Sequence, residues 1–121
     1  MAEDFKKLKI WQKAHELMVQ IYALSKTLPK NEQFNLISQI RRAALSVPAN
    51  IAEAQGRYHD AETIHFLYNA RGSAEEVRSH LIAVFDITYI SKNDFDKLEE
   101  EYAGLIMGIN SFIKSIRQNK S

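Results

Sequence analysis

Cysteine is absent from this 121-residue sequence, and proline and glycine are scarce, with two and four residues. Without thiols the chain can form neither a disulfide framework nor a thiolate metal site, which fits the reducing cytoplasm where we expect the protein to reside. So few glycines and prolines argue against a loop-rich β fold and against a disordered chain. These absences favour a helical globular protein.

Long apolar runs are also missing. No window approaches 18 uninterrupted apolar residues, and the N-terminal stretch Met-Ala-Glu-Asp-Phe-Lys-Lys lacks the apolar segment of a signal peptide. We therefore expect no membrane association. The 16 Lys and Arg residues nearly balance the 15 Asp and Glu residues, for a net charge of +1. Binding to nucleic acid would thus need local clustering of cations, multiplied by oligomerisation.

What the sequence does contain is helical periodicity. Four segments carry apolar residues at three- and four-residue steps, and 45% of the chain is hydrophobic, which is enough for a core. We predict helices over about residues 8–28, 32–55, 60–90 and 92–118. Four amphipathic helices joined by short turns predict a single-domain, all-α protein folded as an antiparallel up-down-up-down four-helix bundle.

Local signals mark the predicted helix ends. Asn31 and Asp60 are predicted N-caps of the second and third helices, and Gly56 is predicted to end the second. Ser91 and Asp94 have the spacing of a capping box at the start of the fourth helix. These residues place the turns.

The predicted third helix has features that suggest contacts on more than one side. Its apolar residues form two stripes, so we interpret one as facing the bundle and part of the other as facing a neighbouring subunit. Gly72-Ser73-Ala74 is a patch of small residues near its middle. Because glycine destabilises a helix interior, this patch predicts close approach of a second helix.

A polar stripe runs along the predicted second helix, beside Pro48. In a structural interpretation, Arg42 and Glu53 pair with Glu76 or Arg71 of the third helix. Ser46 and Asn50 then satisfy backbone groups freed by the proline. The residues of this predicted network are Arg41, Arg42, Ser46, Asn50, Glu53, Ser73 and Glu76.

In a functional interpretation, outward-facing cations bind phosphate oxygens, and Tyr58 and Tyr68 stack on unpaired bases. The predicted nucleic-acid-binding residues are Lys6, Lys7, Lys9, Lys13, Arg57, Arg71, Lys114 and Arg117. The two interpretations are compatible, and the sequence alone does not assign each arginine to one of them.

No catalytic constellation is recognisable in the sequence. It contains no Gly-rich phosphate loop and no Gly-x-Ser-x-Gly nucleophile elbow. We therefore expect a protein that is not an enzyme and has neither a cofactor nor a metal site.

The polar stripe lies within a longer motif that is specific enough to compare with known families. The motif consists of Gln39-Ile40-Arg41-Arg42-Ala43-Ala44, Ser46, Pro48-Ala49-Asn50-Ile51-Ala52-Glu53 and Gly56-Arg57, followed by Phe66-Leu67, Ala70-Arg71-Gly72-Ser73 and Glu76. It resembles the signature of the small four-helix-bundle proteins encoded by bacterial 23S rRNA intervening sequences. The resemblance covers about residues 5–117. Ala54 departs from it, because the family usually has glycine there.

This resemblance implies a cyclic homo-oligomer, and the assembly that we expect from it is a pentamer. The chain is also similar to the accessory variability proteins of diversity-generating retroelements. Together these likenesses imply a non-enzymatic module associated with RNA or DNA. The alternative is a protein–protein scaffold that does not contact nucleic acid directly. Basic residues gathered on one rim would favour the first function, whereas basic residues scattered and paired with Glu62, Glu75 or Glu99–Glu101 would favour the second.

Overall fold

The computed structural model describes residues 4–119, and these residues form helices and no strands. The main helices are α1 (Lys9–Ser25), α2 (Ser38–Gln55), α3 (Asp60–Asp86) and α4 (Lys92–Gln118). A single 3-10 turn, η1 (Phe5–Lys7), precedes α1. The predicted all-α class with four helices is confirmed.

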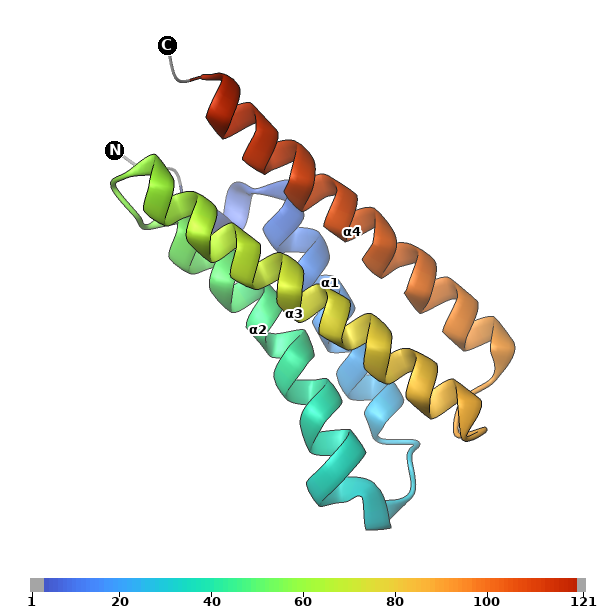
Figure 1. The fold of residues 1–121 in the computed structure, drawn as a ribbon. Coiled ribbons are helices and arrows are strands. Elements are labelled where there is room, and N and C mark those ends of the chain that lie inside the picture. Colours follow the sequence, from blue (N-terminus) through green and yellow to red (C-terminus); the bar gives the residue numbers. More distant parts are fainter. Residues whose placement is uncertain (1–3, 120–121) are drawn as a thin grey trace.

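Neighbouring helices run in opposite directions (Figure 1). Lys13 of α1 contacts Glu101 of α4, and Ile10, one turn earlier on α1, lies against Gly108, further along α4. In the same way, Arg71 and Arg78 of α3 contact Asn110 and Glu99 of α4. As a result, the start of α1, the turn between α2 and α3 and the end of α4 lie at one end of the molecule.

The core lies between the four helices, and each contributes fully buried apolar residues at helical spacing, such as Leu17, Ile40, Leu67 and Ile109. Both apolar stripes of α3 point into this core. The residues buried there are Ile64, Leu67, Ala70, Ala74, Val77, Leu81 and Val84. The end of the second stripe lies outside the core, since Ile87 is 46% exposed, and the interpretation that part of this stripe faces a neighbouring subunit stays a prediction.

The second helix begins later than predicted, at Ser38. A 3-10 turn, η2 (Lys30–Glu32), and a short π-helix, η3 (Gln33–Ile37), precede it. Asn31 lies inside η2 and caps no helix. π-helical turns are wider than α-helical turns and often occur at functional sites. The η3 turn carries Phe34, which is 92% exposed.

The third helix ends at Asp86, before the predicted boundary. Thr88 adopts a left-handed conformation with a φ of 65°. The backbone N–H of Tyr89 donates to the Val84 carbonyl, and that of Thr88 donates to the Phe85 carbonyl, each at 2.9 Å. This pair of bonds is a Schellman motif, which reverses the chain direction and stops the helix.

The remaining end signals are only partly correct. The Ser91 hydroxyl accepts a hydrogen bond from the Asp94 N–H at 3.1 Å, so this predicted cap is confirmed. Gly56 follows the last residue of α2, also as predicted. Asp60 is the first residue of α3 rather than its cap, and its carboxylate favours the helix dipole from that position. The first helix ends at Ser25, because the chain turns there.

Within the small-residue patch of α3, Ser73 and Ala74 contact the bundle, since Ser73 Oγ lies 2.9 Å from Ser46 Oγ of α2 and Ala74 is fully buried. Gly72 itself does not lie at a close helix contact. A Cβ added at Gly72 would meet no atom within 4 Å. The close approach occurs instead at Gly108 of α4, where an added Cβ would lie 3.3 Å from Ile10 Cγ2 of α1.

Candidate nucleic-acid interface

Three members of the predicted polar network form a hydrogen-bonded bridge between α2 and α3. Asn50 Nδ2 donates to the Ser46 carbonyl at 2.8 Å and lies 2.9 Å from Ser46 Oγ. Ser73 Oγ of α3 lies 2.9 Å from the same Ser46 hydroxyl. These polar side chains are half-buried, and the hydrogen bonds between them satisfy their donors and acceptors across the contact between the two helices. The carbonyl that Pro48 deprives of a donor is that of Ala44, so Asn50 does not replace that bond.

Arg41 belongs to a separate cluster at the contact between α1 and α2. Its Nε donates to the hydroxyl of buried Ser25 at 2.6 Å, and its guanidinium lies 5.0 Å from the ring centre of Tyr22. The Ser25 hydroxyl in turn donates to the Tyr22 carbonyl at 2.8 Å. Arg41 therefore has a structural role, although its partners differ from those predicted.

The predicted ion pairs of Arg42 are not formed. Arg42 is exposed and has no acidic partner within residues 4–119. Glu53 pairs with Arg57, which follows α2, and Glu76 lies 3.2 Å from His80 on α3. The sequence-based pairing was wrong because each glutamate has a partner only four residues further along the chain.

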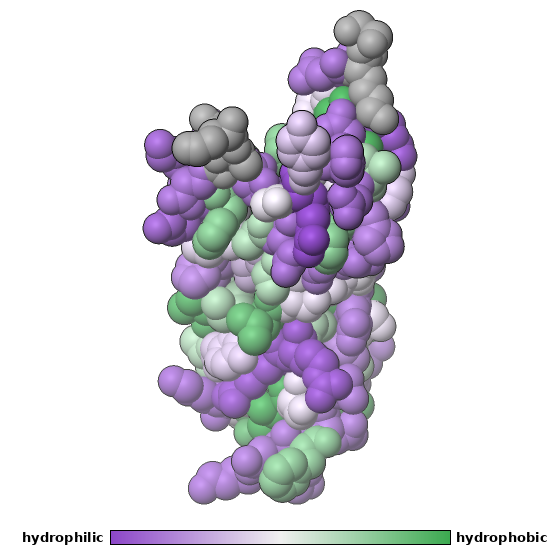
Figure 2. Space-filling view, turned by 90° about the vertical axis from the view of Figure 1, so that its left-hand side faces the viewer, coloured by the Kyte–Doolittle hydropathy of each residue, from purple (hydrophilic) through white to green (hydrophobic). Residues whose placement is uncertain are grey.

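Most of the predicted nucleic-acid-binding residues gather at one end of the bundle. Lys6, Lys7 and Lys9 lie where α1 starts, Arg57 follows α2, and Lys114 and Arg117 lie in the last two turns of α4. The antiparallel register brings these segments together (Figure 1). On the face shown in Figure 2 this end is mostly hydrophilic, whereas hydrophobic residues are visible nearer the middle. We call this group the basic end.

Some cations of the basic end are neutralised and others are not. Lys6 Nζ lies 3.5 Å from Asp4 Oδ2, and Arg57 pairs with Glu53 while its guanidinium lies 4.5 Å from the ring centre of Phe66. All of these charged side chains are solvent-exposed, so such pairs are weak. Lys7, Lys9 and Lys114 are also exposed, and none has an acidic partner in the described part of the chain.

Lys13 departs from the functional interpretation. Its Nζ lies 2.8 Å from Glu101 Oε1 of α4 and 3.7 Å from Glu16 Oε1. The hydrogen bond to Glu101 raises the pKa of Lys13, and the Coulomb attraction of both carboxylates acts in the same direction. Lys13 therefore links α1 to α4 and is not available to a phosphate.

Tyr68 is the centre of a basic cluster between α3 and α4. The guanidinium of Arg71 lies 4.7 Å from its ring centre, and that of Arg117 lies 5.6 Å away. The Arg117 Nη2 donates to the Tyr68 hydroxyl, and the Arg71 Nη1 donates to Asn110 Oδ1 at 2.7 Å. We call Tyr68, Arg71, Asn110 and Arg117 the Tyr68 cluster.

Asn110 was not among the residues predicted from the sequence. Its spacing to Lys114 and Arg117, at steps of four and three, places the three residues on one face of α4 and was the available signal. Tyr58, by contrast, was predicted to be able to stack on bases. It lies in the turn before α3, is 91% exposed and makes an edge contact with His59.

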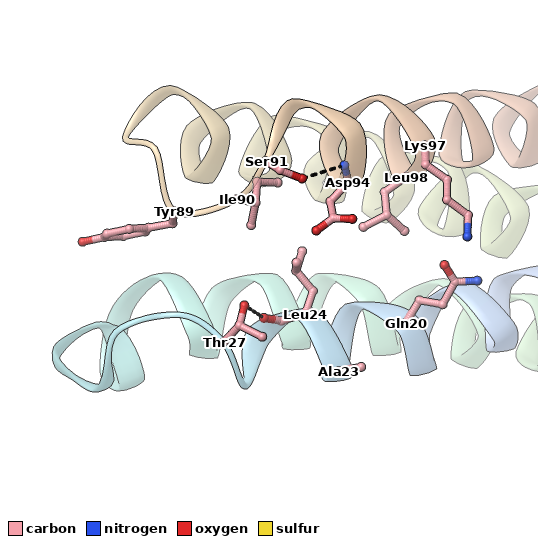
Figure 3. Close-up of a pocket in the computed structure, with 10 residues that line it drawn as sticks. All are labelled: Gln20, Ala23, Leu24, Thr27, Tyr89, Ile90, Ser91, Asp94, Lys97 and Leu98. Atoms are coloured by element: carbon pink, nitrogen blue, oxygen red, sulfur yellow. Dashed lines mark hydrogen bonds between the residues drawn. The ribbon is translucent and has the colours of Figure 1, made fainter.

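The hollow between the end of α1 and the start of α4 has a volume of about 500 Å³ (Figure 3). Two of its hydroxyls serve the local backbone, since Ser91 caps α4 and Thr27 Oγ1 donates to the Leu24 carbonyl at 2.7 Å. Asp94 and Lys97 reach it from α4, and Gln20 reaches it from α1. No base or nucleophile is paired there as an acyl-transfer or proton-transfer site would require.

Residues 4–119 contain no group of three or more histidine or acidic side chains placed to hold a metal ion. Within the same residues, no helix is both long enough and apolar enough to cross a bilayer.

Comparison with known proteins agrees with this description. Residues 6–111 match the family described as 23S rRNA-intervening sequence protein. A solved structure of a protein of unknown function from the S23 ribosomal protein family, from Bacteroides thetaiotaomicron VPI-5482, superposes with a TM-score of 0.81 at 27% identity. The alignment covers 87% of this chain and 98% of that one. The comparison with curated proteins yields no match. This chain belongs to the 23S rRNA-intervening sequence protein family.

Proposed function

We propose that this protein is a non-enzymatic module that binds RNA or DNA through its basic end. The observation that carries the proposal is the gathering of basic residues from three separate segments at one end of the bundle. Several of them have no acidic partner among residues 4–119. Such cations attract phosphate groups and release counterions from the nucleic acid when they bind. Asp60 and Glu62 begin α3 at the same end, so the surface is mixed, with an excess of positive charge.

We further propose that copies of this chain, each an up-down-up-down bundle, assemble into a cyclic homo-oligomer, and specifically a pentamer. Exposed apolar residues support this, because Phe34 is 92% and Leu45 is 49% exposed beside the unpaired Arg42. Apolar groups that water contacts in a single chain are stabilised when a second copy covers them. Cyclic symmetry would then repeat the basic end around one rim, which offsets the small net charge of each chain.

The test is a fluorescence-anisotropy titration of labelled RNA and DNA at several salt concentrations. We compare the parent with Lys6→Gln/Lys7→Gln/Lys9→Gln. The matched control, Lys26→Gln/Lys30→Gln/Lys97→Gln, removes the same charge at the opposite end. The basic-end variant should bind about tenfold or more weakly at low salt. The slope of log K against log salt should become shallower by about 2. Each phosphate contact to a single strand contributes roughly 0.7 to this slope, and the variant loses three such contacts.

A protein–protein scaffold is the alternative, favoured by the neutralisation of Lys13 by Glu101 and by the exposure of Phe34. Absence of any binding by the parent at low salt would reject the nucleic-acid function and favour the scaffold. Equal weakening by the control variant would show that binding depends on total charge and not on the basic end.

A further inference from the structure

We infer that the Tyr68 cluster is where the protein recognises nucleic acid. The cluster binds a single strand, through hydrogen bonds to a phosphate and stacking on a base. This inference rests on the proposed function and adds to it the class of nucleic acid and the residues that recognise it.

The first step is that two guanidinium groups converge without a carboxylate. Those of Arg71 and Arg117 lie 4.7 and 5.6 Å from the centre of one ring. Neither forms an ion pair within residues 4–119, because Glu75, one turn beyond Arg71, pairs with Arg78 at 2.9 Å. The negative face of the ring attracts Arg71, and the hydroxyl at the ring edge accepts a hydrogen bond from Arg117. Neither group of the tyrosine carries a negative charge, so the mutual repulsion of the two cations remains. An anion that contacts both groups would relieve that repulsion.

The second step concerns the remaining hydrogen-bond donors. Each guanidinium has five N–H groups, and within residues 4–119 each makes one hydrogen bond, to the Asn110 amide oxygen for Arg71 and to the Tyr68 hydroxyl for Arg117. Both partners are neutral. They therefore fix the orientation of the two guanidinium groups without neutralising the positive charge of either. A fixed guanidinium with free donors suits bidentate binding to a phosphodiester.

The third step is the aromatic surface beside these cations. Tyr68 is 36% exposed and Tyr58 is 91% exposed. Tyr58 lies in the turn before α3, and Tyr68 lies eight residues after Asp60, the first residue of α3, or roughly 12 Å along the helix. An exposed aromatic ring or guanidinium plane accepts a stacked base only where that base is unpaired, so this surface suits a single strand and not a duplex. Lys114 lies on the same face of α4 as Asn110 and Arg117 and extends the positive surface.

The experiment compares a labelled single-stranded oligouridylate with a duplex of equal length. Arg71→Gln/Arg117→Gln removes both guanidiniums. The matched control Lys26→Gln/Lys97→Gln removes two charges at the far end. We expect the parent to prefer the single strand. The double variant should bind it at least about tenfold more weakly, with the salt slope reduced by about 1.4 for two lost contacts. The control should bind within about twofold of the parent.

A second variant separates loss of recognition from loss of folding. Arg71→Lys/Arg117→Lys keeps both charges and removes the forks, so it should retain the fold, as measured by circular dichroism, and still lose single-strand preference. The inference is overturned if the parent binds the duplex as tightly as the single strand, or if polyglutamate competes as well as oligouridylate does. It is also overturned if the arginine variants bind like the parent while the Lys6/Lys7/Lys9 variant does not, a result that would leave the proposed function standing.

Discussion

Tyr102 is the largest fully buried side chain in the described part of the molecule, and within residues 4–119 its hydroxyl has no hydrogen-bond partner. A buried hydroxyl without a partner has lost its hydration and gained nothing in exchange. Tyr102→Phe removes only this oxygen, so we expect the free energy of unfolding, measured by urea titration, to rise by about 1 kcal/mol. Tyr102→Leu, which leaves a cavity, should lower it. A fall with the phenylalanine variant would mean that the hydroxyl is satisfied in solution.

The same residue predicts a pH dependence. Burial raises the pKa of the Tyr102 hydroxyl above its ordinary value of 10.0. The unfolded chain therefore releases this proton first as the pH rises, and the stability that Tyr102 contributes is complete below pH 10 and declines above it. Urea titrations between pH 9 and 11 should show a shallower decline for Tyr102→Phe than for the parent. Parallel curves would show that Tyr102 ionises equally in both states.

At the scale of the helix, the end of α3 holds strain. Thr88 is β-branched, and a φ of 65° is costly for such a residue. Thr88→Gly should keep the Schellman motif and raise stability by about 1 kcal/mol, although it loses the bond from Thr88 Oγ1 to the Ile87 carbonyl. Thr88→Ala is the matched control, since it removes the hydroxyl but keeps the Cβ. Thermal unfolding checks both, and a glycine variant no more stable than the alanine variant would exclude strain.

The helices were predictable from the sequence, and two of their boundaries show why some ends were not. The limits of α4 were predicted correctly, because apolar periodicity marks the helix and the Ser91 side-chain cap marks where it starts. The same periodicity continues past Asp86, where a backbone conformation that threonine rarely adopts ends α3. Nor does it distinguish the π-helical turn Gln33–Ile37 from α-helix, because the two differ by only about one residue per turn.

The candidate site was predictable to a smaller extent. Residues four apart in the sequence, such as Glu53 near the end of α2 and Arg57 just after it, can be paired from spacing alone. The contact of Arg117 with Tyr68 and that of Arg71 with Asn110 depend on the register between α3 and α4, which local spacing does not contain. The cationic residues of the site could therefore be predicted from the sequence, but the residues that they contact could not.

At the scale of the whole molecule, we expect assembly to depend on the exposed residues of η3 and α2. Arg42 makes no ion pair within residues 4–119, so Arg42→Glu should leave the folding of a single chain unchanged. If Arg42 and Phe34 lie at a contact between copies, Arg42→Glu and Phe34→Ser should each lower the mass measured by light scattering. Lys26→Glu, an exposed change outside that patch, serves as the control. Unchanged mass for both patch variants would exclude this surface as the contact.

The antiparallel register has a consequence for how the molecule meets a large partner. With several unpaired cations at one end and a closer balance of charge at the other, each chain behaves as an electric dipole aligned with the bundle axis. The field of a polyanion exerts a torque on such a dipole before contact is made, so encounters become end-on instead of random. Under the proposed function, the end carrying Phe34 would point away from the nucleic acid, where its exposed ring stays accessible to a second copy of the chain.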